Sequence, residues 1–226
     1  MASFYRNVIK RVESHHGDIA GIEERLPTSL SAQALRELPD HRYLAEMAAC
    51  IFRAGFVWRV ISQKWDGFEE VFNGFLPIWV ASRSPEDIEA MAQDTRIVRY
   101  LTKVKAVQDN AVMILDLEHS HCGIGAFIAD WPSDDIIGLW QYLKKHGSRL
   151  GGNTGQYFLR FVGKDSFILS RDVCTALRAE GLIDSPKPTA LKELKKAQAA
   201  FNQLQQESGR SLAELSMLLA LSLGPR

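Results

Sequence analysis

Apolar residues recur at every third or fourth position along most of this chain, which is the spacing of one face of an α-helix. The alternation of apolar and polar residues that is typical of half-buried strands is nearly absent. The pattern therefore predicts an all-α protein. The most apolar segment, at about 43–64, is predicted to form one long central helix that is buried on most of its faces.

Residues that cap helices mark several of the predicted boundaries. Ser84 precedes a proline and two acidic residues, which together favour the start of a helix. Ser211 and Glu214 have the spacing of a capping box before the last apolar helix. Either Ser170 or Asp172 caps the helix before it. Further helices are predicted over 31–38, 65–72, 97–117, 136–146 and 189–207.

Gly55 interrupts the predicted central helix and is followed by two aromatic residues, Phe56 and Trp58. Glycine inside a helix costs about 1 kcal/mol relative to alanine, so local stability does not explain its presence. Two explanations remain open. Either another part of the backbone approaches closely at Gly55, or the helix ends there and presents its aromatic side chains to a pocket.

The composition is that of a folded globular protein: 226 residues, of which 46% are hydrophobic and 24% are charged. Three cysteines without close pairing, Cys50, Cys122 and Cys174, favour a reducing compartment over a disulfide framework. No apolar run reaches the roughly 20 residues of a membrane span, and residues 1–16 lack the apolar core of a signal peptide. We expect a cytoplasmic protein that does not interact with a membrane.

The formal net charge of zero conceals an asymmetry along the chain. From Lys144 onward there are 13 basic and 7 acidic residues, whereas the part before it has 14 basic and 20 acidic residues. The basic last third allows an anion-binding face on a neutral protein. An uneven distribution over solvated helix surfaces explains the same numbers, and the sequence does not distinguish the two.

The strongest local signal for binding is the glycine-rich turn at 150–155, which joins two predicted helices. Such a turn leaves the backbone amides of Gly151, Gly152 and Asn153 unpaired at a helix N-terminus, where they bind a phosphate oxygen with the aid of the helix dipole. An ordinary helix–helix turn closed by glycine remains the alternative. Four basic residues nearby add positive charge: Lys144, Lys145, Arg149 and Arg160.

This turn resembles the helix-hairpin-helix of DNA glycosylases, in which the hairpin reads L-P-G-V-G-x-x-T-A. Leu150–Gly155 aligns with its second half, and Arg149 stands where the family has its first glycine. The central segment resembles the bacterial 3-methyladenine DNA glycosylase I family. Its motif E-G-F-Q-A-G-L-S-W aligns with Cys50–Trp58, and its motif G-K-x-x-A-x-x-x-N-A aligns with Thr102–Ala111. The resemblance extends over about 43–173, more than half of the chain.

The resemblance implies a two-lobed helix-hairpin-helix DNA glycosylase-like fold and a monofunctional DNA-3-methyladenine N-glycosylase. Such an enzyme flips an alkylated purine out of duplex DNA and releases it by hydrolysis, as a step of base-excision repair. The resemblance further implies that Trp58 stacks against the flipped base and that Phe56 lines the pocket. Duplex DNA with alkylated bases is the implied partner of a monomeric protein, and no cofactor is implied. The implied DNA contacts are Arg149, Gly151, Gly152, Asn153, Thr154 and Lys164.

Two carboxylates are candidates for the catalytic charge. The family's pocket glutamate falls on Cys50, and a thiol is a poor substitute for a carboxylate, so Cys50 is either a pocket residue or simple core. Glu46 lies one helical turn earlier on the same face and is the first candidate. The wider superfamily places an aspartate after the hairpin at the position of Ser170, and Asp172, two residues on, is the second candidate. Alternatively, Glu46 is a surface or core-capping residue and Asp172 a helix cap.

The bacterial branch of the family also binds a structural zinc ion through cysteines and histidines near both termini. In this chain His15, His16, His119, His121 and Cys122 have only a loose metal-ligand spacing and form no set of four ligands. We therefore predict no metal site.

The resemblance also divides the chain. We predict a single glycosylase-like unit over 1–226, with a central helical lobe at about 43–142, the hairpin and the following cap at 143–173, and a second lobe formed by 1–42 and 174–226. Two other functions remain open. One is a DNA-binding relative that lost excision when the pocket glutamate became Cys50, and the other is a helical protein-interaction module.

Overall fold

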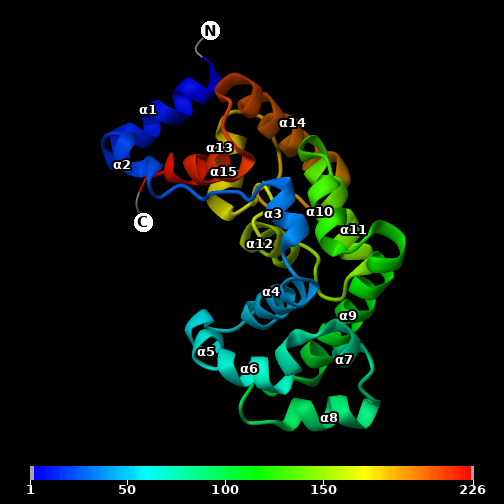
Figure 1. Ribbon diagram of the computed structural model, residues 1–226. Helices are drawn as coiled ribbons and strands as arrows, with labels where there is room; N and C mark the ends of the chain where they lie inside the picture. Colours follow the sequence, from blue (N-terminus) through cyan, green and yellow to red (C-terminus); the bar gives the residue numbers. More distant parts are fainter. Residues whose placement is uncertain (1–2, 225–226) are drawn as a thin grey trace. The chain divides into compact units, whose positions relative to one another are not determined.

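The computed structural model describes residues 3–224 and consists of helices joined by turns (Figure 1). No strand occurs in these residues, so the predicted all-α class is confirmed. The chain divides into two compact units. Unit 1 contains the residues up to 30, residues 132–139 and the residues from 163 on, and unit 2 contains 31–131 and 140–162.

These boundaries differ in detail from the predicted lobes. The N-terminal and C-terminal segments do share unit 1, but the chain leaves this unit after residue 30 and returns to it for good at residue 163. Between these points residues 132–139, which were predicted to lie in the central lobe, also belong to unit 1. The predicted hairpin segment 143–173 is divided, because its first part belongs to unit 2 and the part from Gly163 belongs to unit 1.

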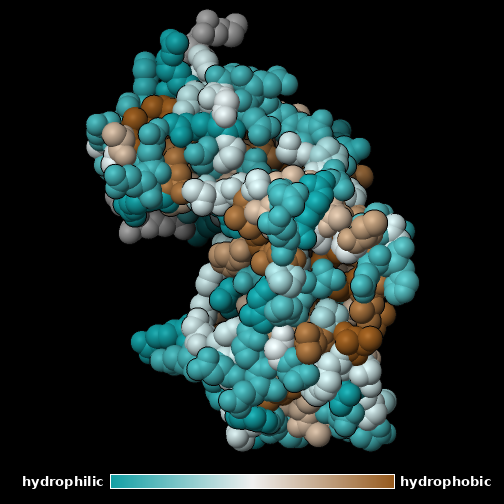
Figure 2. Space-filling model, viewed as in Figure 1, coloured by the Kyte–Doolittle hydropathy of each residue, from teal (hydrophilic) through white to brown (hydrophobic). Residues whose placement is uncertain are grey.

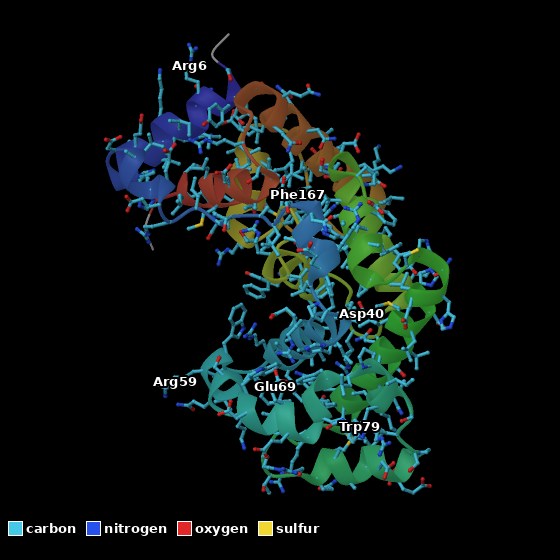
Figure 3. The ribbon with its side chains drawn as sticks, in the orientation of Figure 1. Arg6, Asp40, Arg59, Glu69, Trp79 and Phe167 are labelled. Atoms are coloured by element: carbon cyan, nitrogen blue, oxygen red, sulfur yellow. The ribbon has the colours of Figure 1, made fainter. Side chains whose placement is uncertain are left out.

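Unit 1 is built around the C-terminal helix α15 (Leu212–Leu221), which packs against α1, α13 and α14. Phe167, labelled in Figure 3, stacks on Phe201 in its core, with the two ring centres 4.1 Å apart. Its other helices are α1 (Phe4–His16), α2 (Ala20–Glu23), the 3-10 helix η2 (Ser133–Asp135), α13 (Arg171–Ala179) and α14 (Leu191–Ser208).

Unit 2 is built around the long helix α9 (Leu101–His121), against which α4, α7, α8 and α10 pack. Helix α4 (Asp40–Arg53) also contacts α12 (Asn153–Phe161), which follows the hairpin. The unit further contains α3 (Ala32–Glu37), α5 (Trp58–Gln63), α6 (Trp65–Val71), the 3-10 helix η1 (Asn73–Phe75), α7 (Pro77–Ala81), α8 (Pro85–Gln93), α10 (Ile124–Asp130) and most of α11 (Ile136–His146).

Glu69 of α6 joins two parts of unit 2 through its carboxylate (Figure 3). It accepts two hydrogen bonds of 2.9 Å from the Arg42 guanidinium and one of 3.0 Å from the Trp65 indole nitrogen. The Trp65 ring in turn stacks on Phe68 and Phe75, which are fully buried. A bidentate arginine–carboxylate pair next to a stacked aromatic cluster fixes α6 against the start of α4.

The predicted helix starts at Ser84 and Ser211 are confirmed. Ser84 and Ser211 both start helices with a complete capping box, formed with Asp87 and Glu214. The alternative at the start of α13 is resolved in favour of Ser170, whose hydroxyl accepts a hydrogen bond from the backbone of Val173.

The prediction of one helix over 43–64 is wrong. Helix α4 ends at Arg53, and α5 begins only at Trp58. Gly55 lies between them with φ +80°, a conformation that favours glycine, and a Cβ atom at this position would meet nothing within 4 Å. The glycine is therefore present because the chain turns there, and not because another backbone approaches it.

The boundaries of α9 also differ from the prediction of 97–117. Tyr100 has an extended conformation and precedes the helix, while the other end extends to His121 before Cys122 adopts a left-handed conformation. Hydrophilic residues cover most of the face drawn in Figure 2. None of the helices within residues 3–224 is long and apolar enough to span a membrane.

Candidate active site

A cavity of about 210 Å³ lies in unit 2 between the end of α4, the turn at Gly55 that leads to Trp58, and one side of α12 over its whole length. This volume is below the roughly 300–1,000 Å³ that is usual for drug-sized ligands, and it suits a single small ring system. Its lining consists of Cys50, Arg53, Ala54, Gly55, Trp58, Asn153, Thr154, Tyr157 and Phe161.

Trp58 forms the aromatic wall of this cavity together with two residues of α12. Its ring meets Tyr157 edge to face at 5.6 Å and Phe161 at 6.1 Å. These contacts leave Trp58 46% exposed and Phe161 43% exposed, so neither ring is enclosed in a filled core. Exposed aromatic rings beside an open cavity are suited to stacking against a planar ligand.

Arg53, Glu46 and Cys50 form a polar group at the end of α4. The Arg53 Nη1 atom lies 3.2 Å from Glu46 Oε1, and Cys50 Sγ donates to the same oxygen over 3.6 Å. The Arg53 guanidinium also lies 5.5 Å from the centre of the Trp58 ring and 5.4 Å from that of Phe161. Arg53 therefore connects the carboxylate with the aromatic wall.

The Cys50 thiol is protonated at neutral pH. The side chain is only 5% exposed, and burial raises the pKa of the thiol well above its usual range, with a further rise from the negative charge of Glu46. Cys50 lines the cavity without adding a negative charge to it. It is thus both buried and part of the candidate site.

Phe56 does not line this cavity, in contrast to the prediction. Because the backbone turns over at Gly55, the Phe56 ring instead meets Tyr100 edge to face at 6.2 Å. The ammonium group of Lys103 lies 4.4 Å from the centre of the Phe56 ring. Phe56 remains 37% exposed.

Lys103 fixes the turn that separates α4 from α5. Its Nζ atom donates hydrogen bonds to the backbone oxygens of Phe52 at 3.1 Å and Ala54 at 2.7 Å, which are carbonyls at the end of α4. The side chain is 4% exposed. Burial and, to a lesser extent, the positive charge of Arg149 together lower the pKa of Lys103 to about 8.

The hairpin before α12 is tightly packed. Leu150 is 1% exposed, and its carbonyl oxygen lies so close to Gly155 that a Cβ atom there would be 2.3 Å from it. Gly152, the residue before α12, has φ +61°. The two glycines are therefore required by the backbone, one by close approach and the other by its conformation.

Arg149 stands at the position where the resembling hairpins have glycine, and its backbone has φ +58°. A side chain in this left-handed region costs about 1–2 kcal/mol relative to an unstrained conformation. Arg149 is exposed, donates a hydrogen bond of 2.9 Å to Thr102 Oγ1 and lies 5.9 Å from the centre of the Tyr100 ring. The position thus keeps the hairpin conformation while adding a positive charge.

The N-terminus of α12 has the features of an anion site. No side chain caps it, and Asn153 and Thr154 of its first turn line the cavity. Lys144 and Lys145, in the last turn of α11, are exposed like Arg149. Cationic side chains near free helix amides favour a bound phosphate.

Two predicted site residues lie in unit 1. Asp172 is in the first turn of α13, where Ser170 provides the cap, and is half-buried. Lys164 is 6% exposed, which does not fit the predicted contact with the DNA backbone, because such a contact needs an accessible ammonium group. Within residues 3–224 no three histidine, cysteine, aspartate or glutamate side chains are grouped as metal ligands would be.

The methyladenine glycosylase family matches residues 36–153, which is more than half of the chain and includes the cavity end of α4 and the hairpin as far as Asn153. The chain therefore belongs to this family. DNA-3-methyladenine glycosylase 1 of Escherichia coli is 32% identical over 68 residues, or 30% of this chain and 36% of that protein. DNA-3-methyladenine glycosylase of Haemophilus influenzae is 31% identical over 71 residues, or 31% of this chain and 37% of that protein. The matched segment thus spans about a third of each relative.

Solved structures give the same picture of the fold. The 3-methyladenine DNA glycosylase I of Staphylococcus aureus superposes with a TM-score of 0.50 and 25% identity over 55% of this chain and 76% of that chain. The 8-oxoguanine DNA glycosylase of Methanocaldococcus jannaschii superposes with a TM-score of 0.56 over 93% of this chain and 91% of that chain, at 16% identity. The second match shows the fold alone, and it shows that nearly the whole chain has the helical fold of a DNA glycosylase.

Sequence reasoning missed several residues of the site: Arg53, Lys103, Tyr157 and Phe161. Tyr157 and Phe161 are four residues apart in the helix after the hairpin, a spacing that places two aromatic rings on one helix face. That pair was the one available signal. The role of Arg53 depends on α12 packing against α4, which no local pattern reveals.

Proposed function

We propose that this protein is a base-excision repair enzyme that flips an alkylated purine, such as 3-methyladenine, out of duplex DNA and hydrolyses its N-glycosidic bond. Membership of the methyladenine glycosylase family supports this proposal, as do the two named relatives. Duplex DNA would be the partner, and no cofactor is required for the hydrolysis.

The observation that carries the proposal is the open aromatic cavity beside the hairpin. Trp58, Tyr157 and Phe161 provide ring faces and edges, and Asn153 and Thr154 place the start of α12 at the same cavity. Flipping a base costs a few kcal/mol, and less when the base is damaged. Stacking on an aromatic side chain returns about 1–3 kcal/mol per base, which offsets part of that cost.

The hairpin would hold the DNA backbone next to the flipped nucleotide. The amides of Gly151, Gly152 and Asn153 would bind a phosphate at the N-terminus of α12, and Arg149 would add an exposed charge. Arg59 extends away from α5 beside Trp58 and is a further candidate for a phosphate contact (Figure 3).

The catalytic carboxylate would be Glu46 in preference to Asp172. Glu46 contacts two residues that line the cavity, Arg53 and Cys50. Alkylation that leaves a positive charge on a purine weakens the glycosidic bond, so the reaction needs little acid catalysis. A carboxylate near the site would mainly stabilise the positive charge that develops on the sugar.

Release of free 3-methyladenine from methylated duplex DNA tests the proposal. We expect release by the wild-type protein, a strong reduction in Trp58→Ala and a smaller reduction in Glu46→Gln. Wild-type protein that releases no base above a reaction without protein would reject the excision activity, whereas equal release by Trp58→Ala would reject the role of Trp58.

A second function is favoured by Cys50. A protonated thiol occupies the position of the family's pocket glutamate, so the protein would bind duplex DNA without releasing a base. Salt-dependent binding of duplex DNA with no base release would support this function. Binding with release would exclude it.

A further inference from the structure

Tyr157 of α12 is held at the candidate cavity by two aromatic neighbours. Its ring meets Trp58 edge to face at 5.6 Å, with an angle of 87° between the ring planes, and stacks on Phe161 at 5.8 Å. The match to the methyladenine glycosylase family ends at Asn153, so Tyr157 and Phe161 lie beyond it. The wall that α12 contributes to the cavity therefore lies largely outside the matched segment.

The hydroxyl group of Tyr157 is available to a ligand. Tyr157 lines the cavity, and no group within residues 3–224 forms a hydrogen bond with its hydroxyl. The side chain is half-buried, and its oxygen is not one of the buried polar atoms that lack a partner, so it is accessible. A ligand that enters the cavity meets this hydroxyl group in place of water.

None of the side chains that line the cavity accepts hydrogen bonds without also being able to donate them. Arg53 only donates, and it is already bonded to Glu46 and packed against the aromatic wall. The neutral Cys50 thiol donates to the same carboxylate, which itself is outside the cavity lining. The polar side chains left for a ligand are those of Asn153, Thr154 and Tyr157, each of which donates and accepts.

This composition removes a basis for distinguishing adenines from oxo purines. An amino group at carbon 6 of a purine donates hydrogen bonds, whereas an oxo group there accepts them. A carboxylate in the cavity wall would accept from the amino group and repel the oxo group, because it has no proton to donate. A hydroxyl group rotates and bonds either one.

We propose that Tyr157 contacts the polar edge of the base and that the site binds 6-amino and 6-oxo purines with similar affinity. The inference rests on the proposed function, because it defines the substrate class of the same site. Alkylated guanines are then substrates alongside 3-methyladenine. A positive charge on an alkylated ring favours stacking in both classes and leaves the difference at carbon 6 unchanged.

Two free bases test the inference without requiring excision. 3-Methyladenine has an amino group at carbon 6 and 3-methylhypoxanthine has an oxo group there, while the two are otherwise nearly identical in shape. Slightly above neutral pH both are predominantly uncharged, so charge does not enter the comparison. The readout is the NMR shift of the Trp58 indole N–H during titration of the full-length protein, assigned by its absence in Trp58→Ala.

We expect the wild-type protein to bind the two bases with dissociation constants within about threefold of each other. Tyr157→Phe keeps the ring and removes the hydroxyl group, so both affinities should fall by a similar factor of about two to ten. Tyr100→Phe is the matched control, since Tyr100 is also partly exposed but does not line the cavity. It should leave both affinities unchanged.

Moving a carboxylate into the cavity wall should introduce discrimination. The double variant Glu46→Gln with Cys50→Glu keeps one carboxylate near Arg53 but places it at a lining position. We expect it to bind 3-methyladenine at least about tenfold more tightly than 3-methylhypoxanthine. Glu46→Gln alone is the control and should bind both bases equally. Circular dichroism and the urea midpoint establish that the variants are folded.

A preference of more than about threefold for either base in the wild-type protein, or binding of neither base, would overturn the inference. So would a Tyr157→Phe variant that loses affinity for only one base or for none, and so would a folded double variant that binds both equally. The proposed excision activity fails separately, since a protein that binds both bases equally but releases no base from DNA retains the inference and loses the enzyme function.

Discussion

Asn110 and Ser148 exchange two hydrogen bonds across the hairpin. The Asn110 side-chain amide donates to the Ser148 carbonyl oxygen at 3.0 Å, and the Ser148 backbone amide donates to the Asn110 side-chain oxygen at 2.8 Å. Asn110 is completely buried in the middle of α9. A single side chain on the central helix of unit 2 thus holds the backbone just before the predicted phosphate-binding turn.

Asn110→Ala should weaken both folding and DNA binding. It leaves a backbone donor and a backbone acceptor without partners, and each unsatisfied buried group costs about 1–3 kcal/mol. We expect the free energy of unfolding, from urea denaturation, to fall by about 2–4 kcal/mol. Duplex DNA affinity, from fluorescence anisotropy, should fall as well.

Gln108→Ala is the matched control for Asn110. Its side-chain amide also bonds backbone carbonyls, those of Arg83 at 2.7 Å and Ala81 at 3.4 Å, but it does not contact the hairpin. It should destabilise the fold without changing DNA affinity. If Asn110→Ala bound DNA as tightly as the wild-type protein, Asn110 would have no role in shaping the turn.

Gly55→Ala should reduce base release more than its small effect on the free energy of unfolding would suggest. Alanine at φ +80° is strained, and we expect a loss of about 1–2 kcal/mol in the free energy of unfolding. The strain would shift the turn that carries Trp58, so base release should fall severalfold. Differential scanning calorimetry and the release assay measure the two effects.

Gly17→Ala supplies the comparison for this variant. Gly17 follows α1 with φ +82°, and a Cβ atom there would also meet nothing within 4 Å. Both variants should be destabilised, whereas only Gly55→Ala should lose activity. If the two variants released bases at equal rates, a shift of the turn at Gly55 would not affect the active site.

Lys103 predicts a specific dependence of stability on pH. The pKa of its ammonium group is lowered to about 8 in the folded protein, whereas an unperturbed lysine has a pKa of about 10.4. Between these values the unfolded chain binds a proton that the folded protein has released, so the folded state gains stability as the pH rises. Below pH 8 both states are protonated and the dependence vanishes.

The difference in the free energy of unfolding between wild-type protein and Lys103→Met isolates this effect, because methionine does not titrate. We expect urea denaturation at pH 7, 8, 9 and 10 to show that, above pH 8, the free energy of unfolding of the wild-type protein rises relative to that of the variant. A difference that is constant or that declines with pH would show that the amine is not held in the buried position between the Phe52 and Ala54 carbonyls.

Arg149→Gly separates backbone strain from charge at the hairpin. Glycine adopts φ +58° without strain but loses the hydrogen bond to Thr102, so we expect stability within about 1 kcal/mol of the wild type. DNA affinity should fall, and the slope of log affinity against log salt should decrease by about one unit. Arg149→Lys should restore most of the slope, and a slope unchanged in Arg149→Gly would exclude a phosphate contact.

The sequence predicted the features that depend on residues close together in the chain, such as helix caps. The N-cap at Ser84 and the capping box at Ser211 were recognisable because each needs only a few residues within one helical turn. The sequence left open whether the helix ends at Gly55, since the apolar pattern on either side is continuous and a left-handed turn has no signature beyond the glycine itself.

The composition of the cavity depends on contacts between residues that are distant in the chain. Trp58 was predicted as its aromatic residue, but its neighbours Tyr157 and Phe161 are about a hundred residues further along. Arg53 belongs to the cavity because α12 packs against α4, and Phe56 is outside it because of the turn. Such placements follow from tertiary packing and not from periodicity or spacing.

The most direct test is the rate of base release from methylated duplex DNA by the wild-type protein and two variants at residue 58. Trp58→Phe keeps an aromatic face and should retain most of the activity, whereas Trp58→Ala removes the stacking surface and should reduce the rate at least about tenfold. DNA binding measured in parallel should change much less, because the hairpin is intact. If Trp58→Ala released 3-methyladenine as fast as the wild-type protein, the flipped base would not be held against Trp58, and the cavity beside α12 would not be the active site.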